Sequence, residues 1–345
     1  MESEKCVVGL ETMKKKRKMK KFCAVILTVT ALAPLRRLEI LLQVQNSRNL
    51  QYKDITQGLK HMRRTDGFRG LFKGNGAYIA KAMSCSAVYF AVHYPLARII
   101  GLYCQTPGKE NAKPPILLTR GIHACTVMIA TAAAYPMDVA QGRLSVQTGK
   151  SPYQYRGIYH ALTTIAREEG PRALYKGFLP YSIGQVVYTG LNFAVYGFTS
   201  LSIAKAVLSR FHELKSKGMN RDVNEEVTTA IKKKLPYFQI LSFAVCHTFA
   251  YPFNVIHRRM QMEGWKNSSS IIASCYGSSN NIAAASEFTG MCDAFKKTIR
   301  NNGFKALYKG SVPYLLLKVF PASLFASVVH LGLLESGLEL NIKHP

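Results

Sequence analysis

The chain has 345 residues, of which 46 are Lys or Arg and 19 are Asp or Glu, so its formal net charge is +27. Hydrophobic residues make up 48% of it, which excludes a chain that is mainly disordered or collagen-like. Its 8 Cys residues form no Cys-x-x-Cys pair, which argues against a zinc ribbon and a secreted disulfide scaffold. The positive charge indicates an anionic partner: nucleic acid, anionic lipid or an anionic small molecule.

Charged residues are absent from long parts of the chain. After a basic N-terminal segment, 1–21, charge-free runs begin; the two longest are 177–204, with 28 residues, and 235–256, with 22 residues. An α-helix needs about 20 mostly apolar residues to cross a bilayer. Shorter charge-free runs reach that length once each takes in a turn with one Lys or Arg; they lie at 22–35, 82–97, 121–137 and 319–334. The pattern predicts six membrane-spanning helices.

An internal repeat organises these runs. Residues 57–74, 160–177 and 293–310 align without gaps, and each stretch ends in an aromatic residue followed by Lys-Gly. A recurring unit of this kind is typical of a repeat architecture. Two apolar runs per repeat, taken three times, give the six predicted spans.

The repeats define the expected domain organisation. We place repeat 1 at 22–100, repeat 2 at 114–204 and repeat 3 at 235–335, with a charged connecting segment at 205–234. Repeat 3 contains a Ser-, Asn- and Ala-rich insert at about 267–286, whose composition predicts a surface loop.

A proline stands near the end of the first apolar run of each repeat: Pro34, Pro136 and Pro252. A proline inside a helix removes one backbone hydrogen bond and kinks the helix, so these three can bend their helices toward a common axis. Polar residues two and five positions later lie near that bend. They are Arg36, Asp138 and Asn254 at plus-two, and Glu39, Gln141 and His257 at plus-five.

These motifs resemble the mitochondrial carrier family. The resemblance rests on residues 136–144, on residues 252–261 and on the three Lys-Gly segments, and it covers roughly 31–335. It implies an all-α membrane protein with six transmembrane helices in three tandem repeats, a threefold pseudo-symmetric bundle with a short amphipathic surface helix in each repeat. It also implies a multi-pass transporter of the mitochondrial inner membrane, with no enzymatic activity, cofactor or metal.

Within the family, the chain looks similar to plant mitochondrial adenine-nucleotide carriers. The stretches that suggest this include 41–46, 70–76 and 190–196. The resemblance therefore implies exchange of AMP, ADP or ATP by alternating access. Membrane lipid is an expected partner, with cardiolipin as the candidate lipid at the Leu-x-Lys-Gly segments, and we expect a monomer.

The resemblance implies a gate on the matrix side, in which a plus-two residue meets the plus-five residue of the next repeat. The implied pairs are Arg36 with Gln141, Asp138 with His257, and Asn254 with Glu39. Only the Asp138 pair can be an ion pair, when His257 is protonated. On the cytoplasmic side the family's acidic gate residues have no counterpart here; their positions hold His93-Tyr94, Tyr196-Gly197 and His330-Leu331.

The expected substrate site rests on charges within spans. A Lys in a bilayer is costly, so Lys81 and Lys318 are expected to face a water-filled cavity and meet an anion. The family's substrate-contact level lies at Lys81, at Gly184-Gln185 and at Lys318. The two lysines suit phosphate groups, and Gly184 leaves room for a flat base.

Three alternatives remain at this stage. The missing gate acids allow a degenerate carrier-like membrane protein with little or altered transport. The substrate can also be another anionic nucleotide or cofactor, such as coenzyme A. A basic nucleic-acid-binding protein fits the charge but not the charge-free runs, and the sequence has no basic–aromatic readout motif, so we expect no nucleic-acid partner.

Overall fold

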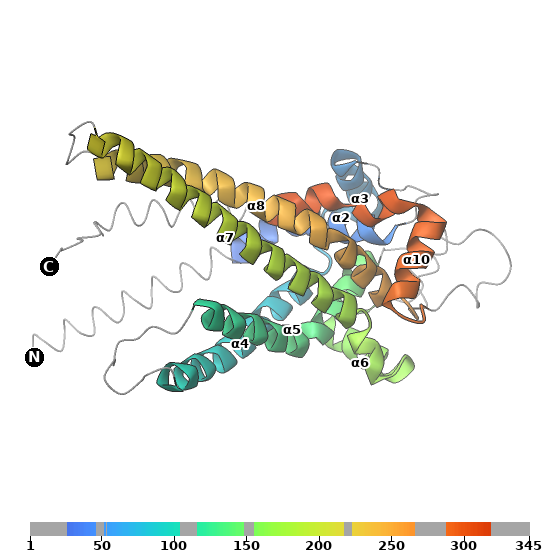
Figure 1. Ribbon diagram of the computed structural model, residues 1–345. Helices are drawn as coiled ribbons and strands as arrows, with labels where there is room; N and C mark the ends of the chain where they lie inside the picture. The colour runs from blue at the N-terminus through green and yellow to red at the C-terminus, as the bar shows by residue number, and fades with distance from the viewer. Residues whose placement is uncertain are drawn as a thin grey trace, which may run out of the picture. The chain divides into compact units, whose positions relative to one another are not determined.

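The computed structural model describes residues 26–45, 52, 54–103, 116–147, 155–216, 223–265 and 288–318 (Figure 1). These ranges are predominantly helical, and none of their residues lies in a strand. The basic segment 1–21, most of the proposed surface loop at 267–286 and His330-Leu331 lie outside the described residues.

Long helices occupy the apolar runs. They are α2 (Ala33–Val44), α4 (Asn75–Tyr103), α5 (Ile116–Val146), α7 (Phe178–Ser216) and α8 (Val223–Gln261), and residues 311–318 are also helical. The 29 residues of α4 extend about 43 Å at 1.5 Å per residue, longer than the roughly 30 Å hydrocarbon core of a bilayer. Among the described residues, one stretch, Leu118–Val146, is both long and apolar enough to count as a membrane span by composition.

Each repeat also contains a short helix that precedes its Lys-Gly segment. These helices are α3 (Ile55–Gly70), α6 (Ile158–Glu168) and α10 (Met291–Asn302), and the last two are followed by the 3-10 turns η1 (Pro171–Tyr175) and η3 (Phe304–Tyr308). Each of the three aligned stretches has a glycine seven residues before its final glycine, and we call this glycine and the residue before it the x-Gly position. The glycine has a positive φ in all three repeats: 73° at Gly67, 86° at Gly170 and 77° at Gly303. A side chain is disfavoured in this conformation, which interrupts α3 at Gly67 and follows the ends of α6 and α10 at the two equivalent glycines.

The described chain forms two compact units. The first runs to Leu179 and includes Ile256–Lys309, and the second comprises Pro180–Val255 with the residues from Gly310 onward. In the first unit α4 packs along α5, and α2 packs against both α5 and α3. Leu38 and Leu41 on α2 and Val139 and Ala140 on α5 are fully buried there.

The prolines and the connecting segment can be compared with the sequence-based expectations. Pro34 lies in the first turn of α2, and the helical residues 26–31 before it are separated from α2 by a break at Leu32. Pro136 and Pro252 do lie inside α5 and α8. The connecting segment 205–234 is mostly helical, because α7 continues to Ser216 and α8 begins at Val223.

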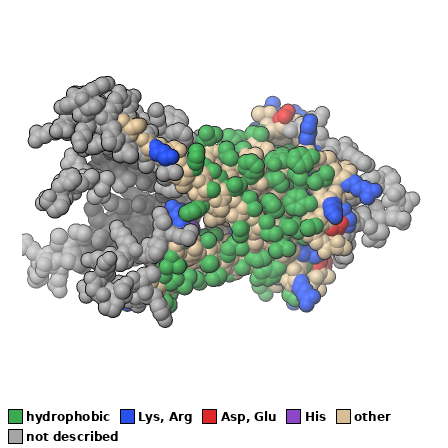
Figure 2. All heavy atoms as spheres, viewed as in Figure 1, with side chains coloured by type: hydrophobic (Ala, Val, Ile, Leu, Met, Phe, Trp, Pro, Cys, Tyr) green, Lys and Arg blue, Asp and Glu red, His purple; other side chains and the backbone are tan. Residues whose placement is uncertain are grey.

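The face of the described helices that Figure 2 shows is largely apolar. Large exposed side chains on α4 and α7 include Met83, Phe90, Ile99, Val186, Phe193 and Phe198. An extended exposed apolar surface of this kind marks contact with a membrane or another protein. Asp138, His257 and Gln261 of the candidate site are buried instead.

Candidate functional site

A single carboxylate gathers four side chains in the first unit. Asp138 is only 1% exposed and lies on α5, two residues after Pro136. Its carboxylate pairs with the ammonium of Lys81 on α4. From α8 it accepts hydrogen bonds from Arg258 Nη1 at 3.1 Å and from Gln261 Nε2 at 2.8 Å, while His257 Nε2 lies 3.0 Å from Oδ2. We call these five residues the Asp138 cluster.

The spacing on α8 explains how three of its side chains reach one carboxylate. His257, Arg258 and Gln261 lie within about one turn of the helix, and residues four apart share a face. Arg258 Nη1 also donates to Gln261 Oε1 at 2.7 Å, which fixes the orientation of both side chains. Burial of charge is costly unless the charges are paired and hydrogen-bonded, and each charged member of the cluster is.

Tyr135 joins the cluster to the Lys-Gly segment of repeat 2. Its hydroxyl donates to the carbonyl of Lys176 at 2.7 Å and lies 3.1 Å from His257 Nδ1. The same His257 nitrogen is 3.1 Å from the carbonyl of Gly177. The repeated Lys-Gly segment is therefore in direct contact with a predicted gate residue.

The three implied gate pairs have different outcomes. The Asp138–His257 contact is present at 3.0 Å. Arg36 does not bond to Gln141; its guanidinium lies 3.5 Å from the ring centroid of Tyr78, a cation–π contact.

The third implied pair is Asn254 with Glu39, whose residues belong to different units, so their contact stays a prediction. Glu39 accepts a hydrogen bond from Gln43 Nε2 at 2.9 Å, one turn along α2. Asn254 donates to the hydroxyl of Tyr314 at 3.1 Å within the second unit.

Three arginines that the sequence analysis did not single out form a second system. We call them the arginine ring, and they are Arg37 on α2, Arg143 on α5 and Arg259 on α8. Each donates to a backbone carbonyl near the C-terminal end of a helix from a different repeat. Arg37 donates to Ser145 O at 2.8 Å and Arg143 to Gln261 O at 3.1 Å. Arg259 Nε donates to Gln43 O at 3.1 Å, which completes the cycle. The C-terminal carbonyls of a helix attract cations.

Acidic residues at the repeated x-Gly position hold two of these arginines. Arg37 Nη2 donates to Asp66 at 2.7 Å, and Arg143 Nη2 donates to Glu169 at 2.7 Å, with a second bond from Nη1. In repeat 3 that position is Asn302, and Arg259 Nη1 lies 3.5 Å from the hydroxyl of Thr298. Two members of the ring therefore have carboxylate partners, and the third has a hydroxyl contact.

The predicted base position is filled by a neighbouring helix. Gly184 is buried on α7, and a Cβ atom at this position would lie 2.9 Å from Phe253 Cβ on α8. In this conformation the glycine permits α7 and α8 to pack closely, so it does not provide open room for a base. Gln185 is half-buried beside it.

Lys318 is exposed in the second unit, and its ammonium lies 5.9 Å from the ring of Tyr314. The hydroxyl of Tyr314 lies 3.0 Å from Nδ1 of His247, which is buried. The ring of His247 stacks on that of Tyr188, with 4.3 Å between the centroids. The structure places His247 in a group of aromatic rings with Tyr188 and Tyr314.

The positions of the cytoplasmic gate carry aromatic stacking in repeat 1. His93 stacks on Tyr89 at 4.9 Å between centroids, and Tyr94 stacks on Phe90 at 5.9 Å. The hydroxyl of Tyr89 also lies 2.9 Å from Nδ1 of His123 on α5. Contacts between α4 and α5 at this level are thus made by rings.

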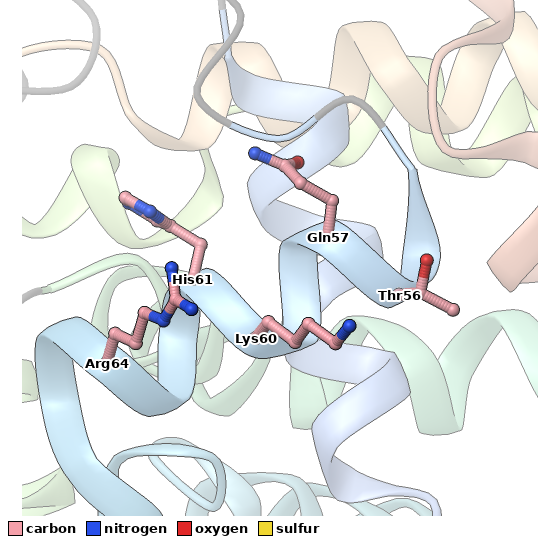
Figure 3. Close-up of a pocket in the computed structure, with 5 residues that line it drawn as sticks. All are labelled: Thr56, Gln57, Lys60, His61 and Arg64. Atoms are coloured by element: carbon pink, nitrogen blue, oxygen red, sulfur yellow. The ribbon is translucent and has the colours of Figure 1, made fainter.

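A separate polar hollow of about 260 Å³ lies on the surface helix α3 (Figure 3). One face of the helix lines it, with residues four apart along the chain: Thr56, Gln57, Lys60, His61 and Arg64. It contains none of the residues that were predicted to bind the substrate.

The sequence matches the family described as mitochondrial carrier protein over residues 22–101, 116–206 and 240–331. It is 47% identical over 302 residues to the mitochondrial adenine nucleotide transporter ADNT1 of Arabidopsis thaliana, covering 87% of this chain and 81% of that protein. It is 30% identical to the human mitochondrial coenzyme A transporter SLC25A42, covering 69% of this chain and 67% of that protein.

A third relative, the calcium-dependent mitochondrial ATP-magnesium/phosphate carrier protein 2 of Arabidopsis thaliana, is 29% identical over 90% of this chain and 54% of its own length. The match covers all three repeats, which confirms the predicted all-α bundle of six transmembrane helices. Family members are transporters and not enzymes. The chain therefore belongs to the mitochondrial carrier family, and it is a multi-pass protein of the mitochondrial inner membrane.

Proposed function

We propose that this carrier exchanges adenine nucleotides (AMP, ADP and ATP) across the mitochondrial inner membrane by alternating access. The observation that carries the proposal is the 47% identity to an adenine nucleotide transporter over 87% of the chain. The coenzyme A transporter at 30% identity is considerably more distant. Lys81 and Lys318 are the cations expected to meet the phosphate groups.

The Asp138 cluster and the arginine ring are the proposed matrix-side closure. Both systems connect helices from different repeats through buried polar contacts, and alternating access requires such contacts to form and break. Pro136 and Pro252 are the proposed bends that direct α5 and α8 toward this closure. Arg36, Glu39, Gln141 and Asn254 complete the proposed gate.

Membrane lipid is the proposed second partner, and cardiolipin is the candidate lipid. The Leu-x-Lys-Gly segments end at Gly74, Gly177 and Gly310, where the backbone turns and a helix begins. Backbone N–H groups at a helix start favour a phosphate. We propose that the chain works as a monomer, since each repeat is present once in the same polypeptide.

Transport into proteoliposomes tests the proposed function. Purified protein is reconstituted in vesicles that are either empty or loaded with unlabelled ADP, and uptake of labelled AMP, ADP, ATP and coenzyme A is followed. We expect uptake of adenine nucleotides that requires internal nucleotide and falls strongly in Lys81→Ala. Lys296→Ala, which removes an exposed lysine of α10, is the matched control and is expected to transport normally. Uptake of coenzyme A alone would refute the proposal.

A further inference from the structure

Asp138 binds three basic side chains that differ in how firmly they are held. His257 is 2% exposed at its side chain and is also placed by Tyr135 and the carbonyl of Gly177. Arg258 is 14% exposed, uses two nitrogens on the carboxylate and is further bonded to Gln261. Lys81 is 20% exposed and makes its contact with Asp138 through one ammonium group.

Lys81 is therefore the cation of the cluster that can most readily exchange partners. An ammonium on a flexible four-carbon stem is a point charge with rotatable donors, whereas a guanidinium with two bonds to one carboxylate is fixed in orientation. Lys81 lies in the second turn of α4, whereas Arg258 and His257 belong to the last turns of α8. Its release would leave both α8 side chains on Asp138.

A nucleotide phosphate offers Lys81 the same kind of acceptor as Asp138 does. Both are oxyanions, and two anions cannot share one ammonium closely without mutual repulsion. The phosphate and the Asp138 carboxylate must then compete for Lys81.

From this geometry we infer that Lys81 is shared: Asp138 holds it in the nucleotide-free closed state, and the substrate phosphate takes it over. Asp138 is accordingly a positioning residue for substrate binding as well as a gate residue. Transfer of Lys81 removes one cation from the gate carboxylate and weakens the link between α4 and α5 as the nucleotide binds. The inference rests on the proposed nucleotide exchange.

A double-mutant cycle on transport tests this inference. The KM for labelled ADP is measured in proteoliposomes for the wild type, Asp138→Asn, Lys81→Gln and the double variant. We expect Asp138→Asn to lower the KM on the order of fivefold, the factor that corresponds to about 1 kcal/mol for a partly exposed ion pair. In the Lys81→Gln background the same substitution is expected to leave the KM unchanged.

Lys318→Gln is the matched control. It removes the other lysine expected to bind phosphate, which is exposed and lies against Tyr314. In that background Asp138→Asn is still expected to lower the KM, because Lys81 is intact. An equal change of KM in all three backgrounds would show that Asp138 does not act through Lys81, and would overturn the inference.

The melting temperature of variants with one lysine replaced provides a second measurement, because it reports the pair between Lys81 and Asp138 in the absence of transport. In the absence of nucleotide we expect Lys81→Gln to lower the melting temperature, since it breaks the pair with Asp138, and Lys318→Gln to leave it unchanged. Equal melting temperatures for wild type and Lys81→Gln would also overturn the inference. A folded wild type that takes up no adenine nucleotide would refute the proposed function itself, whereas uptake with an unchanged KM in Asp138→Asn refutes this inference alone.

Discussion

Replacement of Arg143 by Gln should destabilise the protein more than the same change at Arg259. Arg143 is fully buried, donates twice to the carboxylate of Glu169 and also donates to the carbonyls of Gln261 and Glu263. Arg259 makes its ring contact with one carbonyl and lies near the hydroxyl of Thr298. Both arginines follow the proline of their repeat by seven positions, so they form a matched pair for this comparison.

The expected magnitudes follow from those partners. Removing one member of a buried ion pair costs about 3–5 kcal/mol because the other charge stays buried. Loss of hydrogen bonds from a charged donor to neutral acceptors costs about 1.5–3 kcal/mol. With an unfolding entropy of about 2.1 cal/mol/K per residue, 1 kcal/mol shifts the melting temperature of 345 residues by about 1.4 °C. We therefore expect a decrease of about 4–7 °C for Arg143→Gln and about 2–4 °C for Arg259→Gln.

Thermal unfolding in detergent measures both values. A dye that becomes fluorescent on reacting with thiols is suitable, because Cys246 is fully buried and becomes accessible on unfolding. Wild type and both variants are heated at the same protein and detergent concentrations. A decrease for Arg259→Gln that equals or exceeds the decrease for Arg143→Gln would refute the idea that the carboxylate partner distinguishes these sites.

Three further predictions concern other parts of the chain. Gly184→Ala should lower the melting temperature, because the added Cβ lies 2.9 Å from Phe253 Cβ and overpacking costs about 1–3 kcal/mol; a changed KM without that decrease would contradict the packing role. Asn302→Asp places a carboxylate at the position where Asp66 and Glu169 bind arginines in the other repeats, so it should raise the melting temperature and slow exchange; an unchanged melting temperature would contradict this. At Asp293, a hydrogen bond from Lys297 one turn later holds the pKa of the carboxyl below its ordinary value of 3.8. The stabilisation is thus present above that value and lost as the pH falls through the folded-state pKa, so Asp293→Asn should lower the melting temperature at neutral pH and not in strong acid.

The sequence was sufficient to predict the repeated elements. The glycine of each x-Gly position interrupts or follows a helix. The positive φ at Gly67, Gly170 and Gly303 explains why glycine recurs there. Local signals of this type depend on the conformation of a few residues, so they can be read without knowledge of the fold. At Pro34 the break between residues 26–31 and α2 lies at Leu32, two positions before the proline, and a proline in the first turn of a helix is a recognised start signal.

Contacts between repeats were only partly predictable. The plus-two and plus-five spacing, combined with the family pairing rule, identified the contact of Asp138 with His257. It did not identify Arg258 or Lys81 as partners of the same carboxylate. Arg258 is adjacent to the predicted partner His257 but is not at a plus-two or plus-five position, and Lys81 lies on α4, which the pairing rule does not include. A search of equivalent positions would have found only part of the arginine ring, because Arg143 and Arg259 follow their prolines by seven positions whereas Arg37 follows Pro34 by three.

The arginine ring bears on the argument that lost gate acids mean lost function. Arg36 and Asn254 stand where the family has acidic residues, which removes ion pairs from the gate. The ring bonds to backbone carbonyls, however, and every residue at the end of a helix presents a carbonyl whatever its side chain. Substitution at plus-two and plus-five positions therefore leaves these three links between repeats intact. A carrier that closes mainly through arginine–carbonyl bonds, with Asp138 as one charged centre, has fewer ion pairs to separate during each cycle, so the departures from the family pattern are compatible with transport.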